Sequence, residues 1–333
     1  MAFIALLEKD DYLMSNFKRV LKAIASYFGA ILISKITYKQ IVSQRDAAFN
    51  LLLNNTVNLN SGSVCVIFSK DRPLQIYSLL DSYFKCVNNP LPVTVIYNTK
   101  NLELEDAYLQ VAKLFLDLKV TVKFVKEIVS FKETLLSVLV EISVDKVLFL
   151  VDDIVFIKPV NFGLLEIIDP HLNVLSLRHS PFLTKSYTTK TLQSAPTFLE
   201  SSLSEELLEF QWFEKGCEWS DPWSVDGHFL STLEVRLISQ ISDFKAPNTF
   251  EIALKAFNSN IIDRKGLCFK ESKILNLPIN RVQNEVDNVS GNISVDFLLD
   301  KWREGLAIDT SIFDNHIPLS THEEHEIKFR KIT

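Results

Sequence analysis

Short apolar runs alternate with helix-length segments between Val64 and Val151, and this alternation constrains the fold more than any other feature of the sequence. The apolar runs predict four buried strands, over residues 64–68, 92–98, 120–125 and 147–151. The segments between them predict helices over residues 73–86, 102–118 and 131–142. Continuously apolar strands separated by helices are typical of parallel sheets that are covered on both faces. The sequence therefore predicts an α/β fold with a mostly parallel sheet flanked by helices.

The pattern is less regular on both sides of this region. Residues 1–56 contain few helix-breaking residues and predict two or three helices. Beyond residue 151 we expect a strand, a polar loop and two helices, over residues 174–177, 181–198, 203–215 and 225–241. These elements divide the chain into an N-terminal helical segment, a central domain and a polar C-terminal tail that wraps the surface, over residues 1–60, 61–310 and 311–333.

The closest approach to a membrane span lies at residues 20–36. About a dozen apolar or weakly polar residues lie between Lys22 and Lys35, whereas a transmembrane helix needs roughly 20. An amphipathic helix fits this segment better, packed on its own domain, on a partner or on a membrane surface. Packing on its own domain is the simplest of the three. Peripheral membrane contact or homo-oligomer formation through residues 1–56 stays open as a further role.

Composition excludes several classes of function. The 333 residues include only eight glycines, and neither a Walker A pattern nor GxGxxG occurs, so P-loop and dinucleotide-binding functions lose their best support. The 35 basic and 41 acidic residues give a net charge of −6, which offers no general attraction for nucleic acid. The four cysteines show no metal-type spacing, and Glu8 and Asp10 interrupt any secretory signal. These features favour a cytoplasmic protein.

Two adjacent carboxylates, Asp152 and Asp153, follow the most apolar of the predicted strands. In a parallel sheet the ligand binds beyond the carboxyl ends of the strands, so this pair belongs to the ligand-binding edge. Adjacent buried carboxylates repel each other unless a cation or hydrogen-bond donors compensate their charge. One interpretation is that a divalent cation binds there together with ligand phosphates. The other is that one carboxylate caps the next turn while its neighbour faces water.

The order of these parts carries a resemblance to a known family. A strand followed by a polar SKDR loop, a strand ending in YNT, two further strand–helix steps and a VDD at a strand end resemble the GT-A class of nucleotide-sugar glycosyltransferases, of the bacterial polysaccharide and exostosin-like type. The resemblance covers about residues 64–180, with looser similarity to about residue 285. It implies that Asp152 and Asp153 hold Mn²⁺ or Mg²⁺ on the donor diphosphate. The third position of the family's acidic motif is Ile154 here, so a site with one carboxylate ligand or without metal is the alternative.

The loop after the first strand supplies most of the other donor-side candidates. By the resemblance, these candidates contact the nucleotide: Phe68, Ser69, Lys70, Arg72 and Asn98. The resemblance also implies that Lys70 or Arg72 lies near the diphosphate. Cations beside the start of a helix suit phosphate, and arginine can bind it through two hydrogen bonds. The alternative is a surface ion pair between Asp71 and a neighbouring cation. We favour nucleotide binding because the loop lies at the same sheet edge as Asp152.

Residues 219–228 gather two tryptophans, two aspartates, a histidine and a glycine. Tryptophan faces can stack on sugar rings, and a carboxylate at a helix start can act as a base. Inverting enzymes of the resembling family place an acidic base in the corresponding acceptor region, which selects Asp226, with His228 as an orienting or metal-binding group. The alternative is that Asp226 caps a helix and that Trp219 and Trp223 belong to the core.

Two polar loops and a histidine-rich tail complete the candidates. Residues 247–251 and 276–283 combine proline with amide side chains, a composition that suits hydroxyl-rich ligands and turn formation alike. The tail contains five potential metal ligands, His316, His322, Glu323, Glu324 and His325. A solvated polar run is the interpretation that we favour for the tail.

Together these features predict a glycosyltransferase that moves a sugar from a nucleotide-sugar donor to a glycan or lipid-linked acceptor. Residues 61–180 would form the nucleotide half and residues 181–310 the acceptor half, with cell-surface polysaccharide synthesis at the inner membrane face as the natural setting. A cation or Lys and Arg groups would stabilise the leaving diphosphate, and an inverting enzyme would use Asp226 to deprotonate the acceptor hydroxyl. The alternatives are a nucleotidyltransferase, whose Gly-rich signature is missing, and a non-catalytic protein that retains the nucleotide-binding fold.

Overall fold

The computed structural model describes residues 4–7, 31–56, 59–116, 120–214, 216–282 and 291–332. The chain forms two compact units, Met1–Thr56 and Val57–Thr333. In the first unit, strands β1 (Ile4–Leu7) and β2 (Ile31–Ser34) pair in parallel, and helix α2 (Lys35–Asn54) follows. Within the described ranges, no helix combines the length and the apolar character that a membrane crossing needs.

Of the two or three helices expected in residues 1–56, the described residues contain α2, and Ile4–Leu7 and Ile31–Ser34 form strands β1 and β2 instead. The end of the segment at residues 20–36 forms β2 and the start of α2. The Ile-Leu-Ile sequence of β2 favours a strand because β-branched side chains lose rotamer freedom in a helix. Residues 20–30 lie outside the described part of the chain, so the amphipathic helix expected there is not tested.

The second unit contains α-helices, 3₁₀-helices and strands. Its α-helices are α3 (Pro73–Cys86), α4 (Leu102–Leu114), α5 (Phe131–Glu141), α6 (Thr232–Ile241), α7 (Pro247–Lys255) and α8 (Val295–Arg303). The strands of its main sheet are β3 (Asn60–Lys70), β5 (Val93–Asn98), β6 (Val122–Lys126), β7 (Val144–Val151), β10 (Asn173–Ser176), β13 (Leu199–Glu200), β14 (Leu207–Gln211), β15 (His228–Ser231) and β16 (Lys265–Phe269). The short strand pairs are β4 (Val87–Asn88) with β9 (Val160–Asn161), β8 (Ile154–Phe156) with β17 (Ile274–Asn276), β11 (Lys185–Ser186) with β12 (Thr191–Leu192), and β18 (Leu306–Ile308) with β19 (Phe329–Lys331). The 3₁₀-helices are η2 (Phe162–Ile167), η3 (Glu218–Ser220), η4 (Asn258–Asn260) and η5 (Thr310–Phe313).

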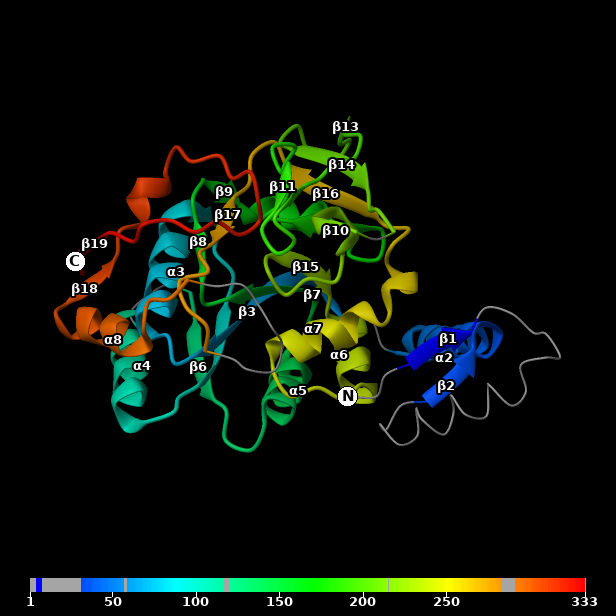
Figure 1. Cartoon of the computed structure of the whole chain (residues 1–333), viewed down its shortest axis with the longest axis horizontal. Helices are drawn as coiled ribbons and strands as arrows, with labels where there is room; N and C mark the ends of the chain where they lie inside the picture. Colours follow the sequence, from blue (N-terminus) through cyan, green and yellow to red (C-terminus); the bar gives the residue numbers. More distant parts are fainter. Residues whose placement is uncertain are drawn as a thin grey trace. The chain divides into compact units, whose positions relative to one another are not determined.

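The main sheet of the described residues has nine strands in the order β13-β14-β16-β10-β15-β7-β3-β5-β6 (Figure 1). Strands β3, β5, β6 and β7 are parallel to one another, and β10 and β16 run in the same direction. Strands β14 and β15 are antiparallel to their neighbours. The predicted α/β fold with a mostly parallel sheet is therefore confirmed. The carboxyl ends of β3, β5, β7 and β10 meet at one edge of this sheet.

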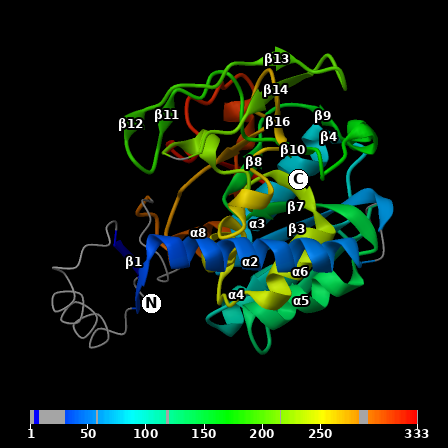
Figure 2. The same ribbon diagram turned by 90° about the vertical axis from the view of Figure 1, so that its right-hand side faces the viewer.

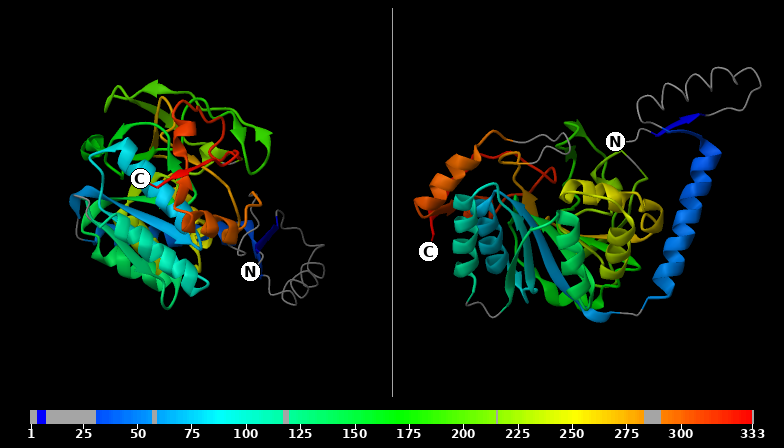
Figure 3. Two further views of the ribbon diagram at one scale, coloured as in Figure 1. Left: turned by 90° about the vertical axis from the view of Figure 1, so that its left-hand side faces the viewer. Right: turned by 90° about the horizontal axis from the view of Figure 1, so that it is seen from below.

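Helices cover both faces of the sheet. Helices α3, α4 and α8 pack together on one face, and α5, α6 and α7 pack together on the other (Figures 1 and 3). Helices α5 and α6 lie side by side along this second face (Figure 2). Alternate side chains of β3 divide between the faces: Cys65 and Ile67 join the cluster around α3, and Phe68 contacts Phe131 of α5 with ring centroids 5.1 Å apart. Such alternation is expected for a strand that is buried on both faces.

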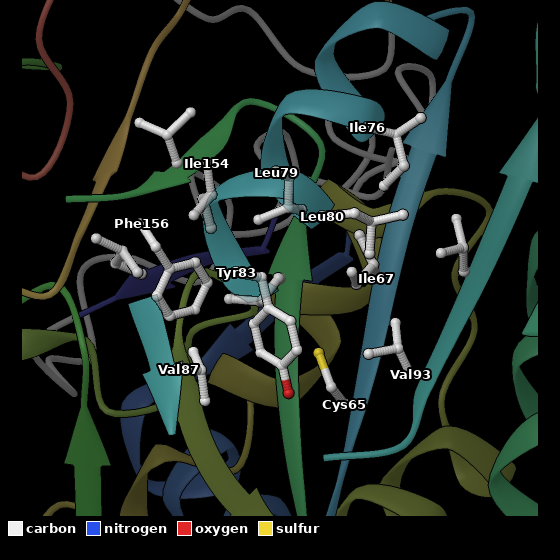
Figure 4. Close-up of a cluster of buried hydrophobic side chains, with 14 of the residues drawn as sticks. Cys65, Ile67, Ile76, Leu79, Leu80, Tyr83, Val87, Val93, Ile154 and Phe156 are labelled. Carbon is white, nitrogen blue, oxygen red and sulfur yellow. The ribbon is translucent and has the colours of Figure 1, made fainter. Parts of the chain in front are cut away.

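Helix α3 is held against the sheet by its apolar side chains. It begins at Pro73, whose missing N–H has no partner to lose in the first turn of a helix. Ile76, Leu79 and Tyr83 are buried in the cluster shown in Figure 4. Full burial of a large apolar side chain stabilises the fold by about 1.5–3 kcal/mol. This packing fixes the position of the loop that precedes α3 at the sheet edge.

Two helices were expected in the second half of the chain, and the prediction is wrong for the first and partly wrong for the second. Residues 203–215 contain β14, whose Leu207 and Phe210 are buried and which pairs with β16. The first part of residues 225–241 forms β15, and α6 starts only after Ser231, whose hydroxyl accepts from Glu234 N. Leucine-rich runs are compatible with a helix or a strand, so pairing with strands that are distant in the sequence makes these residues strands. The tail does not simply wrap the surface, because Thr321 is buried.

Candidate functional site

A cavity of about 500 Å³ opens where the parallel strands of the main sheet end. Its walls come from the loops after β3, β5, β7 and β10, from the start of α7 and from the C-terminal tail. The predicted site residues that line this cavity are Phe68, Ser69, Lys70, Arg72, Asn98, Asp152, Asp153 and Asp226. The structure thus brings together the acidic pair, the loop after the first strand and the predicted base, which are far apart in the sequence.

The loop between β3 and α3 is tied to the neighbouring loop after β5. Asp71 has φ = 56°, a left-handed conformation that aspartate adopts more readily than most residues. Its backbone N–H donates to Asn98 O at 3.1 Å, and its carboxylate accepts from Lys100 N at 2.7 Å. Asp71 is buried, so it supports the loop and does not form the surface ion pair considered as an alternative.

Asp152 is held by three donors. Its Oδ2 accepts from Ser69 Oγ at 2.8 Å and from Lys70 N at 3.1 Å, and its Oδ1 pairs with Arg72 Nη1 at 2.6 Å. Tyr108 of α4 reinforces this arrangement, because its hydroxyl lies 2.5 Å from Ser69 Oγ and accepts from Arg72 N at 3.0 Å. The Asp152 side chain is 4% exposed, and its charge is compensated within the protein. Asp152 therefore positions Arg72 and the β3 loop.

Arg72 also connects the acidic pair to the loop that follows β17. Its Nε donates to Asn280 Oδ1 at 2.9 Å, and its Nη2 donates to the Asn280 carbonyl oxygen. The guanidinium group is thereby fixed by Asp152 on one side and by Asn280 on the other. Lys70, by contrast, has an exposed side chain at the cavity. Arg72 contributes a fixed positive charge, and Lys70 is the more adaptable cation for a phosphate.

Asp153 is the more accessible member of the acidic pair, with a side chain that is 17% exposed. Its Oδ1 accepts from Asn276 Nδ2 at 3.4 Å, and its Oδ2 lies 3.7 Å from Arg72 Nη1. Burial raises the pKa of Asp153 to about 6, Arg72 opposes this shift, and Asp152 adds to it. Because these contacts are long, Asp153 has carboxylate oxygen available for a hard divalent cation.

Asp226 lies in the turn before β15. The next residue, Gly227, has φ = 84°, and a Cβ atom there would lie 2.2 Å from Ile274 Cδ1. Only glycine fits this turn, so Gly227 determines where Asp226 stands. The cap of α6 is Ser231, which excludes the alternative that Asp226 caps the helix expected from residue 225.

The Asp226 carboxylate has weaker compensation than Asp152. Its Oδ2 lies 3.3 Å from Arg178 Nη1 and 3.7 Å from His322 Nε2. Burial raises the pKa of Asp226 to about 8; Arg178 opposes this shift, whereas Glu251 and Asp153 add to it. A carboxyl group with this pKa exchanges its proton near neutral pH, as a general base must.

Further charged groups surround Asp226. Lys255 Nζ donates to Asp221 Oδ2 at 2.7 Å and to Glu251 Oε1 at 2.6 Å. Burial raises the pKa of Asp221 to about 6, with Glu251 adding to the shift and Lys255 opposing it. The region is therefore rich in carboxylates that are only partly neutralised, in contrast to the surroundings of Asp152.

His228 and the two tryptophans belong to the core. His228 does not line the cavity; its Nδ1 lies 3.0 Å from Pro222 O, and its ring packs against Trp212. Burial lowers the pKa of His228 to about 3, so this ring is neutral. Trp219 and Trp223 have no exposed surface, so the interpretation of these side chains as a sugar-stacking platform is wrong.

Several cavity residues were not predicted. Arg178 lies after the end of β10, just as Asp152 lies after the end of β7. A charged residue that follows an apolar strand was therefore the signal that could have predicted Arg178. His322 was considered only as part of the tail. His322 reaches the cavity because its backbone forms an isolated parallel β-bridge with Asn276. No local sequence pattern indicates that contact. Both polar loops also reach the cavity, through Asn248 and Glu251 of the first and Asn276 and Asn280 of the second.

No protein-family model matches the sequence, and no curated protein is significantly similar to it. The chemistry of the site is therefore interpreted from its own residues and geometry.

Proposed function

We propose that the unit Val57–Thr333 is a GT-A-type glycosyltransferase that moves a sugar from a nucleotide-sugar donor to a glycan or lipid-linked acceptor. Cell-surface polysaccharide synthesis at the cytoplasmic face of the membrane is the setting we propose for it. The observation that carries the proposal is that Asp152, Asp153 and Asp226 line one cavity of about 500 Å³. That volume is in the range of small-molecule and cofactor sites.

The donor side of the cavity suits a diphosphate. Lys70 and Arg72 place positive charge beside the acidic pair, and Asn98 adds an amide to the same wall. Phosphate oxygens accept hydrogen bonds from such cations, and the charge that develops on a leaving diphosphate is stabilised by them. The Arg72 guanidinium is already oriented by Asp152 and Asn280, so little ordering remains when a ligand binds.

The residues present fit a divalent cation that has one protein carboxylate. Asp153 has available oxygen, whereas both Asp152 oxygens accept from protein donors. Mg²⁺ and similar hard cations are often bound by one or two carboxylates, with phosphates and water supplying the other ligands. Asp153 would hold Mn²⁺ or Mg²⁺ on the donor diphosphate, where the ion supplies Lewis-acid stabilisation of the leaving group. Asp152 would position Arg72 beside it.

For transfer with inversion, the acceptor oxygen forms a bond to the anomeric carbon while the bond from that carbon to the diphosphate oxygen breaks. The diphosphate leaves with the electron pair, and the acceptor proton passes to Asp226. Arg178 orients the Asp226 carboxylate, with Nη1 and Oδ2 3.3 Å apart. The raised pKa of Asp226, about 8, makes it a stronger base than an ordinary aspartate. A retaining enzyme would not require this base.

Nucleotide binding is the first test. Thermal unfolding should be measured with UDP, GDP and CMP, each with and without Mn²⁺. A nucleotide at about 100 times its dissociation constant stabilises the native state by about 2.7 kcal/mol, so the matching one should raise Tm clearly. Asp153→Ala should remove the Mn²⁺-dependent part of this shift. If none of the nucleotides raises Tm, the donor site is wrong.

Product analysis separates the remaining alternatives. A glycosyltransferase releases the nucleoside diphosphate from the donor sugar, with the sugar transferred to an acceptor or to water. A nucleotidyltransferase instead releases pyrophosphate from a nucleoside triphosphate. Stable binding of a nucleotide sugar without either product would identify the non-catalytic alternative.

A further inference from the structure

Three side chains from the C-terminal part of the chain converge outside the cavity lining. His316 Nε2 lies 2.5 Å from Glu323 Oε2, and His325 Nε2 lies 3.0 Å from the same oxygen. The potential ligand atoms of the three residues lie within 4.8 Å of one another. The two imidazole rings are nearly perpendicular, with centroids 4.9 Å apart. The side chains are 18–28% exposed, so the cluster is partly shielded but open to ions from solution.

The Glu323 carboxylate is oriented independently of the histidines. Its Oε1 accepts from Leu319 N at 2.7 Å and from Ser320 N at 3.3 Å, which leaves Oε2 directed to the two rings. Its own backbone N–H donates to Asn276 O at 3.1 Å. Hydrogen bonds of this kind fix a ligand's position before a metal ion binds.

The two other polar residues of this tail sequence have different partners. His322 lines the cavity near Asp226, and Glu324 Oε1 accepts from Tyr187 Oη at 2.5 Å. The structure therefore separates the potential ligands into three that converge and two that do not. The preference for a solvated run does not account for this convergence.

We propose that His316, Glu323 and His325 form a site for a transition-metal dication of the Zn²⁺ class. Two imidazole nitrogens with one carboxylate oxygen are a common zinc donor set, whereas Mg²⁺ and Ca²⁺ prefer oxygen ligands alone. On binding, the two hydrogen bonds to Oε2 are replaced by bonds from the ligand atoms to the ion. Any proton on an Nε2 atom moves to Nδ1 or to solvent, so that neutral imidazoles face the metal.

Such an ion would cross-link the two ends of the segment from residue 316 to residue 325. This segment carries Thr321, whose hydroxyl donates to Glu218 Oε2 at 3.0 Å, and His322, which lines the cavity. The metal would therefore hold one wall of the cavity in place. The proposal is independent of the glycosyltransferase assignment, because it rests on residues outside the cavity lining.

The test uses the full-length protein after treatment with a chelator. Zn²⁺ binding should be measured by calorimetry and Co²⁺ binding by visible absorption, which reports histidine ligation and low coordination number. We expect one Zn²⁺ per chain at this site. Glu323→Gln and His325→Asn should each weaken Zn²⁺ binding by about 10–100-fold or more, since loss of even an indirect partner has effects of that size. Glu324→Gln is the matched control and should bind Zn²⁺ like the wild type.

Each variant must first show native circular dichroism and cooperative unfolding without metal. Gln at position 323 can still accept from Leu319 N and Ser320 N, so we expect that variant to fold. If either Glu323→Gln or His325→Asn does not fold, His316→Asn is used in its place. No Zn²⁺ binding by the wild type, or equal Zn²⁺ affinity and equal Co²⁺ spectra in wild type and ligand variants, would overturn the proposal.

Discussion

The acidic groups Asp152 and Asp226 line the same cavity, but the protein compensates them to different degrees. Asp152 accepts from three donors at 2.6–3.1 Å. Among the described residues, Asp226 has only long contacts, with Arg178 at 3.3 Å and His322 at 3.7 Å, and burial raises its pKa to about 8. A well-compensated carboxylate fixes its neighbours in place, whereas an under-compensated one readily accepts a proton. The contrast supports the positioning role proposed for Asp152 and the proton-transfer role proposed for Asp226.

The largest expected effect is on catalysis at Asp226. A general base typically contributes about 10²–10⁴-fold, so Asp226→Asn should lower kcat by about that factor while the affinity for the nucleotide changes little. Steady-state kinetics with donor and acceptor, together with calorimetry of nucleotide binding, measure the two quantities. A kcat near the wild-type value would remove the base role, and Asp221, Glu251 or a retaining mechanism would take its place.

The next effect separates stability from activity within the acidic pair. Asp152→Ala leaves the Arg72 charge buried without its closest partner, which should lower the free energy of unfolding by about 3–5 kcal/mol. Asp153→Ala removes only long contacts and should change that free energy much less. Both variants should lose sugar transfer. Urea unfolding of the two variants gives the comparison.

Equal loss of stability in the two variants would contradict the different roles of Asp152 and Asp153. Near-wild-type transfer in both would contradict the assignment of this pair to the donor diphosphate. The matched design matters because both substitutions remove the same atoms from adjacent positions.

A smaller effect follows from the pKa of Asp226, which is about 8 in the folded protein against about 4 in an unfolded chain. Between these values the folded state holds a proton that the unfolded state has released. This contribution to stability therefore falls as the pH rises through this window, by at most about 1.4 kcal/mol per pH unit. Asp226→Asn removes this titration and with it the pH-dependent loss of stability. The variant should therefore gain stability relative to the wild type as the pH rises from 5 to 8.

Denaturant unfolding of both proteins at pH 5, 6.5 and 8 measures this difference. A stability difference that does not change with pH would show that Asp226 is compensated as well as Asp152, and the contrast between them would disappear.

The central strands could be predicted because burial on both faces leaves them continuously apolar. Strand β3 and helix α3 illustrate this, since the run from Val64 and the proline at position 73 marked them directly. Strand β14 could not be predicted, because its Leu207–Gln211 sequence becomes a strand through pairing with β16, about 60 residues later. Local patterns do not contain that pairing.

The same limit applies to the site. Asp152 and Asp153 could be located because they end a buried strand, and Asp226 because it precedes one of few glycines. Their partners could not, since Arg178 is 48 residues from Asp226 and His322 comes from the tail. The sequence places His228 in the site because it is near Asp226, yet the glycine turn at Gly227 separates the two side chains. Asp226 lines the cavity, whereas the His228 ring packs against Trp212. Which side chains meet at a sheet edge is decided by topology.

The smallest expected effect concerns the unit Met1–Thr56. Every described residue that lines the cavity belongs to Val57–Thr333, so deletion of residues 1–56 should leave nucleotide affinity and the pH dependence due to Asp226 nearly unchanged. We expect the deletion to reduce membrane association or oligomer formation, measured by vesicle co-sedimentation and light scattering. Loss of folded protein would show instead that this unit supports the fold of Val57–Thr333. The contrast between the two carboxylates would then depend on a part of the chain whose described residues do not line the cavity.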